Sequence, residues 1–265
     1  MNLLAIVLCF VVAAKNCYAQ DPIVPSKFLP TIRDGQLANL DKFARLSLSA
    51  TVRFEWVDPK STDTANVLAL WIPAKDKFLS TDPFPDEPER SWKKDPITIA
   101  LLFGGSDGSS PPWKLFDRYP DDLLAERVSI TSDVSSDDSY VVTAYFTAGE
   151  GPRLYVDWHI KEENCYYPHY VEERIGNDKK SAVLTRESKF SYQTIDDTVL
   201  PKIVISKNFD RGTGRLVHQK TIILTRIAMN SLPHVDNVLS SDDLTEEMLF
   251  DTEQLILKEP DLTTR

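Results

Sequence analysis

Apolar and polar side chains alternate in segment after segment of this chain, and this pattern restricts the fold more than any other feature. In Leu154–Ile160, for example, successive side chains alternate with the period of two that is typical of a half-buried β-strand. Most segments are joined by short turns, which favours antiparallel pairing because a parallel pair needs a crossover of a dozen or more residues. The segments with strand character are 52–56, 66–72, 77–80, 140–147, 154–160, 167–175, 183–193, 200–206 and 216–229. We therefore expect a mainly β (α+β) fold: an antiparallel curved sheet or open barrel of about nine or more strands, packed on a few short helices.

The first 19 residues predict a cleaved export signal. Their apolar run, from Leu3 to Ala14, is too short to span a bilayer and is followed by Cys17-Tyr-Ala19, a small-x-small pattern. After cleavage, Cys165 is the only cysteine, so the chain cannot form an intramolecular disulfide. The sequence has no Asn-x-Ser/Thr acceptor, so we expect a bacterial periplasmic protein, with the cell exterior as the alternative.

We expect residues 20–235 to form one domain. Its Pro-rich start, 20–35, predicts extended chain, and the spacing of apolar residues predicts a helix over Leu37–Leu48 with Asp34 as its cap. Residues 236–265 hold nine acidic and two basic residues and predict an acidic extension. Asp243-Leu-Thr-Glu246 resembles a capping box before a short helix that ends at Phe250. A solvated tail is a simpler interpretation than an EF-hand, whose central glycine is missing here.

The charge balance limits the partners. The chain has 40 acidic and 30 basic residues, which argues against nucleic acid and against anionic membrane surfaces. We expect a monomer, and peripheral contact with the cell envelope remains open.

The stretch Phe103–Trp113 (FGGSDGSSPPW) raises the question of catalysis. It lacks the Gly-x-Ser-x-Gly spacing of a nucleophile elbow and the Gly-Lys-Ser/Thr end of a phosphate loop. The preceding residues, Asp95–Phe103, predict a short apolar helix that ends at Gly104, where a left-handed cap favours glycine, although a strand is the alternative. We interpret these glycines as a structural turn.

Residues 157–173 hold the densest cluster of potential metal ligands, including Asp157, His159, Cys165 and His169. Imidazole and thiolate groups suit zinc, but the spacing fits no compact ligand pair, so a hairpin with a charged outer face is the preferred interpretation. No Ser or Cys is placed beside a base by the sequence. We expect no metal, no cofactor and no catalytic residues, and therefore a protein that is not an enzyme.

The aromatic residues alternate on the predicted strands. Most aromatic residues in this pattern form a core, but in an open barrel they can also line a cavity for a lipid. The candidate lining residues are Val52, Phe54, Trp56, Trp71 and Trp158.

The order of these features resembles the periplasmic lipoprotein-sorting carrier family. The resemblance lies in the Trp71–Lys75 turn, in Asp197–Ile203, and in Ile227–Asn230 followed by Leu232-Pro233, and it is best over 140–235. It implies a half-open antiparallel barrel around helices, closed over an apolar cavity, with a lipid or a lipidated protein as partner. One departure is that Pro73-Ala74-Lys75 stands where the family pattern has Lys-Arg-Pro, whose arginine is implicated in gripping cargo.

Three functions follow from these observations. The first is an exported carrier that binds an apolar ligand non-covalently. The second is an envelope scaffold with the same fold and a filled core, and the third is a hydrolase whose site is assembled from residues distant in sequence.

Overall fold

The structure is a computed structural model that describes residues 23–75, 77–81, 102–104, 127–132, 139–147, 151–230, 242, 244–250 and 255–256. Its main element is one antiparallel sheet in the order β3-β2-β1-β10-β9-β8-β7-β6-β5-β4, with β11 paired to β10. The strands are β1 Leu46–Trp56, β2 Ser61–Ile72, β3 Lys77–Ser80, β4 Val128–Ser132, β5 Ser139–Thr147, β6 Arg153–Lys161, β7 Pro168–Gly176, β8 Val183–Ile195, β9 Thr198–Phe209, β10 Leu216–Met229 and β11 Leu255–Ile256.

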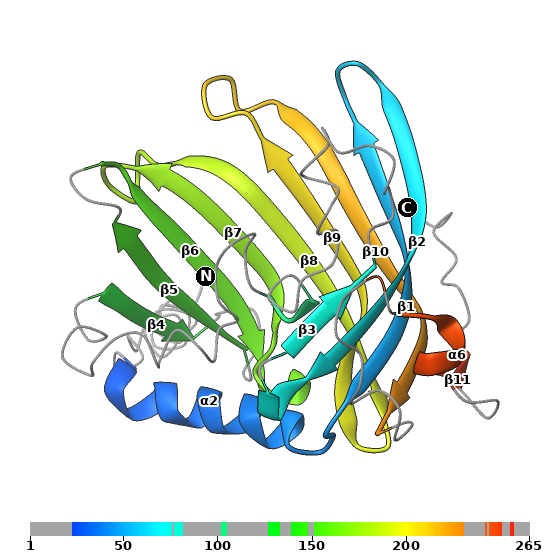
Figure 1. Ribbon diagram of the computed structural model, residues 1–265. Coiled ribbons are helices and arrows are strands. Elements are labelled where there is room, and N and C mark those ends of the chain that lie inside the picture. Colours follow the sequence, from blue (N-terminus) through cyan, green and yellow to red (C-terminus); the bar gives the residue numbers. More distant parts are fainter. Residues whose placement is uncertain are drawn as a thin grey trace, which may run out of the picture.

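The sheet is curved and is not closed among the described residues (Figure 1). From β1 to β3 and from β4 to β10, sequential strands pair with one another, and β1 pairs with β10, which brings the two ends of the domain together in the middle of the sheet. Among the residues that the structure describes, the edge strands are β3 and β4, and an isolated bridge joins Ile130 of β4 to Ile23. The predicted fold class, a half-open antiparallel curved sheet with few helices, is confirmed. Strand β4 was not predicted.

The first described helix differs from the prediction. Helix α2 spans Pro25–Leu40, so the segment expected to be extended is mostly helical, and residues expected at the end of the helix, Leu46–Leu48, belong to β1. Pro25 occupies the first turn, where its missing N–H costs nothing and its fixed φ favours a helix. Asp34, the expected cap, lies inside α2 and pairs with Arg33.

Buried side chains hold α2 against the sheet. Leu29, Ile32 and Leu40 belong to the main hydrophobic core. Asn39 is also buried, and its side chain bonds both backbone groups of Val199 on β9: Nδ2 donates to the carbonyl at 2.8 Å, and Oδ1 accepts from the N–H at 2.8 Å. The helix is thus fixed to the sheet by apolar packing and by a pair of buried hydrogen bonds.

We call the sheet face that packs against α2 the inner face, and the opposite one the outer face. Inner-face side chains form one continuous hydrophobic core with α2 and with the described pair Leu102 and Phe103. An aromatic series crosses this core from Phe43 through Trp71, Phe103 and Tyr167 to Tyr192, with successive ring centroids 5.1–5.9 Å apart.

The acidic C-terminal segment is not a solvated tail where the structure describes it. Leu244, Leu249 and Phe250 are buried and form a second apolar cluster with Leu70 and Ile72 on the outer face. The short helix, α6, spans Glu246–Leu249, and its cap is Thr245, whose hydroxyl accepts from the Met248 N–H, not Asp243 as expected.

Gly104 has a φ of +87°, as expected for a glycine in a left-handed turn. Asp95–Leu101, Ser106 and Asp107 lie outside the described residues, as does the predicted signal peptide. None of the described helices has the length and hydrophobicity that a membrane span requires.

Candidate functional site

The predicted lining residues lie mostly on the inner face. Val52, Phe54, Trp71 and Trp158 are at most 4% exposed and belong to the main core. Trp56 is half-buried at the end of β1, with its ring centroid 4.6 Å from that of His218. Strand alternation puts Val52, Phe54 and Trp56 on one face of β1, as expected, and Trp56 pairs there with His218 of β10. Contact of the predicted lining residues with a ligand remains a prediction.

One row of the inner face is wholly apolar. Strand register aligns Val52 of β1 with Ile222 of β10, Ile222 with Val204 of β9, and Val204 with Phe190 of β8. All four side chains are buried. This row runs across four neighbouring strands in the centre of the sheet.

Next to the apolar row lies a belt of buried polar side chains, which we call the polar belt. It consists of Glu173 of β7, Arg186 and Ser188 of β8, Ser206 of β9 and Lys220 of β10. Arg186 and Glu173 form an ion pair at 3.3 Å with side chains only 7% and 10% exposed, and Ser188 donates to Ser206 at 3.1 Å.

The polar belt also contacts Phe54, which lies next to the apolar row on β1. The Lys220 ammonium lies 5.5 Å from the centre of the Phe54 ring, and Lys220 is 7% exposed. One row further on, the side-chain amide of Asn208 lies 2.8 Å from Nε2 of His218. Along β8, β9 and β10 the inner face thus changes from apolar to polar within two residues.

Sequence reasoning did not find the polar belt. Lysine, arginine and glutamate in a strand ordinarily indicate the solvent side, and these residues were assigned to no site. The sequence does contain a signal, because residues two apart in a strand lie on the same face. Arg186 and Ser188 therefore share the face of Phe190, and Lys220 shares the face of Ile222.

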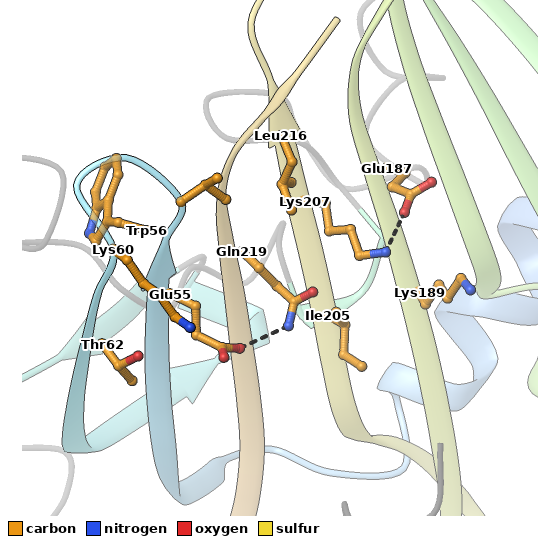
Figure 2. Close-up of a pocket in the computed structure, with 11 residues that line it drawn as sticks. Glu55, Trp56, Lys60, Thr62, Glu187, Lys189, Ile205, Lys207, Leu216 and Gln219 are labelled. Atoms are coloured by element: carbon orange, nitrogen blue, oxygen red, sulfur yellow. Dashed lines mark hydrogen bonds and ion pairs between the residues drawn. The ribbon is translucent and has the colours of Figure 1, made fainter.

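A groove of about 660 Å³ opens on the outer face (Figure 2). It runs from the β1–β2 hairpin across β10 and β9 to β8, and its walls combine apolar and charged side chains. The lining residues are Glu55, Trp56, Val57, Lys60, Thr62, Glu187, Lys189, Ile205, Lys207, Leu216 and Gln219. Trp56 is the one predicted site residue that lines it.

Both carboxylates of the groove are fully engaged. Glu55 accepts from Arg53 and from Gln219, each at 3.0 Å, through different oxygens. Glu187 pairs with Lys207 at 3.0 Å through one oxygen and accepts from the Tyr170 hydroxyl at 3.3 Å through the other. Desolvation, together with Glu172 and Glu187 on either side of the Tyr170 hydroxyl, raises the pKa of that phenol, so it stays a donor at neutral pH.

The cluster considered for zinc forms the β6–β7 hairpin with a charged outer face, as preferred from the sequence. Asp157 accepts from Lys179 at 2.7 Å and pairs with Arg174 at 3.4 Å. In the part of the chain that the structure describes, no group of three or more His, Cys, Asp or Glu side chains is arranged to hold a metal ion. The expectation that the protein needs no metal remains a prediction.

Cys165 follows the 3₁₀ turn Glu162–Asn164 in a left-handed conformation, with φ of 54°. Its Sγ lies 3.8 Å from Oδ1 of Asn39, and burial raises the pKa of the thiol. A raised pKa leaves less thiolate, the form that attacks substrates, so the geometry gives this cysteine no sign of an activated nucleophile.

No protein-family model and no curated protein matches the chain. Among solved structures, one match is a Vibrio parahaemolyticus domain described as an outer membrane lipoprotein-sorting protein domain. It has 12% identity and a TM-score of 0.40, over 77% of this chain and 94% of that one. Another is a DUF1329 family protein from Desulfovibrio piger, with 11% identity and a TM-score of 0.40, over 87% of this chain and 100% of that one. Both similarities are distant.

Proposed function

We propose that the protein is an exported, non-enzymatic carrier that holds a lipid, or the lipid part of a lipidated protein, against the inner face of its half-open sheet. The observation that supports this proposal is the division of the inner face into an apolar row and an adjoining polar belt. An amphiphilic ligand has the same division, with an apolar chain and a polar headgroup.

The polar belt is difficult to explain by stability alone. Removing two charges from water costs several kcal/mol per ion, and replacing a buried ion pair by apolar residues is often neutral or stabilising by about 1–4 kcal/mol. The Arg186–Glu173 pair and the nearby Lys220 therefore suggest selection for something other than stability. With two cations and one carboxylate, the belt favours a headgroup that carries negative charge or accepts hydrogen bonds.

A scaffold with a filled core is the second candidate, and one observation favours it. The aromatic series from Phe43 to Tyr192 packs ring against ring next to α2, which is what a core built for rigidity would contain. The two candidates differ at the apolar row of Val52 and Ile222, where only the carrier would admit an acyl chain.

Photolabelling with residue resolution tests the proposal. The mature protein is irradiated with a palmitate analogue that carries a diazirine in its chain, and the modified residues are identified by mass spectrometry. We expect labels on the inner face, at Val52, Phe54 or Ile222. Labels confined to outer-face residues such as Arg53, or no label at all, would contradict the proposal.

A double variant tests the polar belt itself. Glu173→Leu with Arg186→Met removes both charges at similar volume, so we expect it to fold with stability within about 2 kcal/mol of the wild type. The carrier proposal predicts weaker binding of the palmitate analogue, and the scaffold alternative predicts no effect. The matched control, Glu172→Leu with Arg174→Met, removes an ion pair from the outer face (2.6 Å in the structure) and should leave inner-face labelling unchanged.

A further inference from the structure

The outer groove has an excess of positive charge, although the whole chain carries a net charge of −10. Each of its two carboxylates is already engaged through both oxygens, as described above. Lys207 is engaged by Glu187. Lys60 and Lys189 have no ion pair or side-chain hydrogen bond to any described residue, and both are exposed.

These two lysines stand at opposite ends of the groove. Figure 2 shows Lys60 beside the β1–β2 hairpin and Lys189 on β8, with Gln219 and Lys207 between them. Strands lie about 4.8 Å apart, so the four spacings from β2 to β8 extend over roughly 19 Å. One leaflet of a bilayer's hydrocarbon core is about 15 Å thick, so a single acyl chain fits within this length.

The groove also has an apolar wall. Val57, Leu216 and Ile205 line it. The volume of about 660 Å³ is within the range of about 300–1,000 Å³ that is typical of small-ligand sites. The apolar wall offers a surface on which an acyl chain can lie. The ammonium at either end of the groove can pair with the anionic end of that chain.

We propose that the outer groove is a second binding site, distinct from the inner face, for a single-chain anionic amphiphile such as a fatty-acid carboxylate. The carboxylate pairs with Lys60 or Lys189, and the chain lies against Val57, Leu216 and Ile205. Because the chain as a whole is acidic, an extended anionic membrane is repelled, and an individual amphiphile is the better occupant.

Titration calorimetry with dodecanoate, below its micelle concentration, tests this site. Lys60→Gln with Lys189→Gln should weaken binding by about tenfold or more, because hydrogen bonds to charged groups contribute that much on average. The matched control is Lys27→Gln with Lys180→Gln, which removes two exposed lysines outside the groove and should bind dodecanoate as the wild type does.

Three further probes separate the alternatives. Inorganic phosphate tests a site for free anions, dodecyl maltoside tests a site for uncharged chains, and anionic phospholipid vesicles test a membrane-docking surface. We expect weak or no binding of all three. The proposal would be overturned if any of the three bound as tightly as dodecanoate does. It would also be overturned if the groove variant and the control variant had the same affinity for dodecanoate.

Photolabelling locates the bound ligand. A dodecanoate analogue that carries a diazirine in its chain should label Leu216 or Ile205 in the wild type and in the Glu173→Leu/Arg186→Met variant, and this labelling should decrease in the Lys60→Gln/Lys189→Gln variant. Loss of inner-face labelling with retained labelling of the groove would contradict the carrier proposal alone. Retained inner-face labelling without a label on Leu216 or Ile205 would contradict the groove alone.

Discussion

Replacing Gly104 with alanine tests whether the glycine-rich stretch after Phe103 serves as a structural turn. Gly104 has φ of +87°, and a Cβ added there would lie 1.9 Å from Cγ and 2.7 Å from Cδ of Pro168. The proline ring cannot rotate away, and Pro168 opens β7. The Gly104 carbonyl also accepts a hydrogen bond from the buried Trp158 indole at 3.0 Å, so a shift of this backbone disturbs the core.

The expected loss of stability in Gly104→Ala has two parts. A left-handed conformation costs a non-glycine residue about 1–2 kcal/mol, and overpacking of a tight site costs about 1–3 kcal/mol. We therefore expect Gly104→Ala to lower the free energy of unfolding by about 2–5 kcal/mol. Gly214 is the matched control: its φ is +67°, but nothing lies within 4 Å of an added Cβ, so Gly214→Ala should cost only the conformational part.

Urea unfolding followed by fluorescence measures both variants. A double-mutant cycle adds Pro168→Ala, which removes the clashing ring atoms and should recover about 1–3 kcal/mol of the Gly104→Ala cost. If Gly104→Ala costs no more than Gly214→Ala, or if Pro168→Ala recovers nothing, the close approach of these two residues is not a feature of the folded protein.

Three other predictions follow from the fold. Asn39→Leu leaves both backbone groups of Val199 without their buried partner and should cost about 2–4 kcal/mol in urea unfolding; a cost under about 0.5 kcal/mol would show that α2 is not fixed to β9 in this way. Burial raises the pKa of Tyr167 far above its usual range, so its contribution to stability is complete below pH ~10 and is lost as the pH rises above that value. Stability between pH 9 and 12 should therefore decline less steeply in Tyr167→Phe, and an unchanged slope would contradict the burial of this phenol. Phe250→Ala should cost about 3 kcal/mol because Phe250 packs under the Arg226 guanidinium, 4.5 Å from its ring centre, and a change near zero would mean that the C-terminal segment does not cover the outer face.

The sheet was predictable from the sequence because each strand carries its own signal. Residues 77–80 and 216–229 were predicted with the bounds that the structure has. Alternation and turn residues are local properties of the sequence, so they can be recognised without knowing which strands pair. Strand β4, with only Ile130 fully buried, gave too weak an alternation to be recognised.

The start of helix α2 differs from the prediction because a Pro-rich segment is typical of extended chain. Pro25 instead begins the helix, and Pro30 is tolerated inside it, where its side chain is exposed. The apolar spacing at Leu29, Ile32 and Leu40 indicates a helix once that assumption is removed. Tertiary packing, including the Asn39 hydrogen bonds, then outweighs the local cost of an interior proline.

The sites could be predicted only in part. Alternation placed Val52 and Phe54 on the inner face, but whether Arg186 and Lys220 share that face depends on the parity of two further strands. The outer groove depends on register across five strands, which brings Lys60 and Lys189 to one surface from positions far apart in the sequence. No local pattern contains that information.

Native mass spectrometry of the protein isolated from its own cell envelope tests the carrier proposal most directly. The carrier proposal predicts a bound species with the mass of a lipid. This species should be lost on mild activation and reduced in the Glu173→Leu/Arg186→Met variant but not in the Glu172→Leu/Arg174→Met control. A spectrum with the mass of the polypeptide alone, under conditions that preserve the lipid of a known carrier treated in parallel, would contradict it.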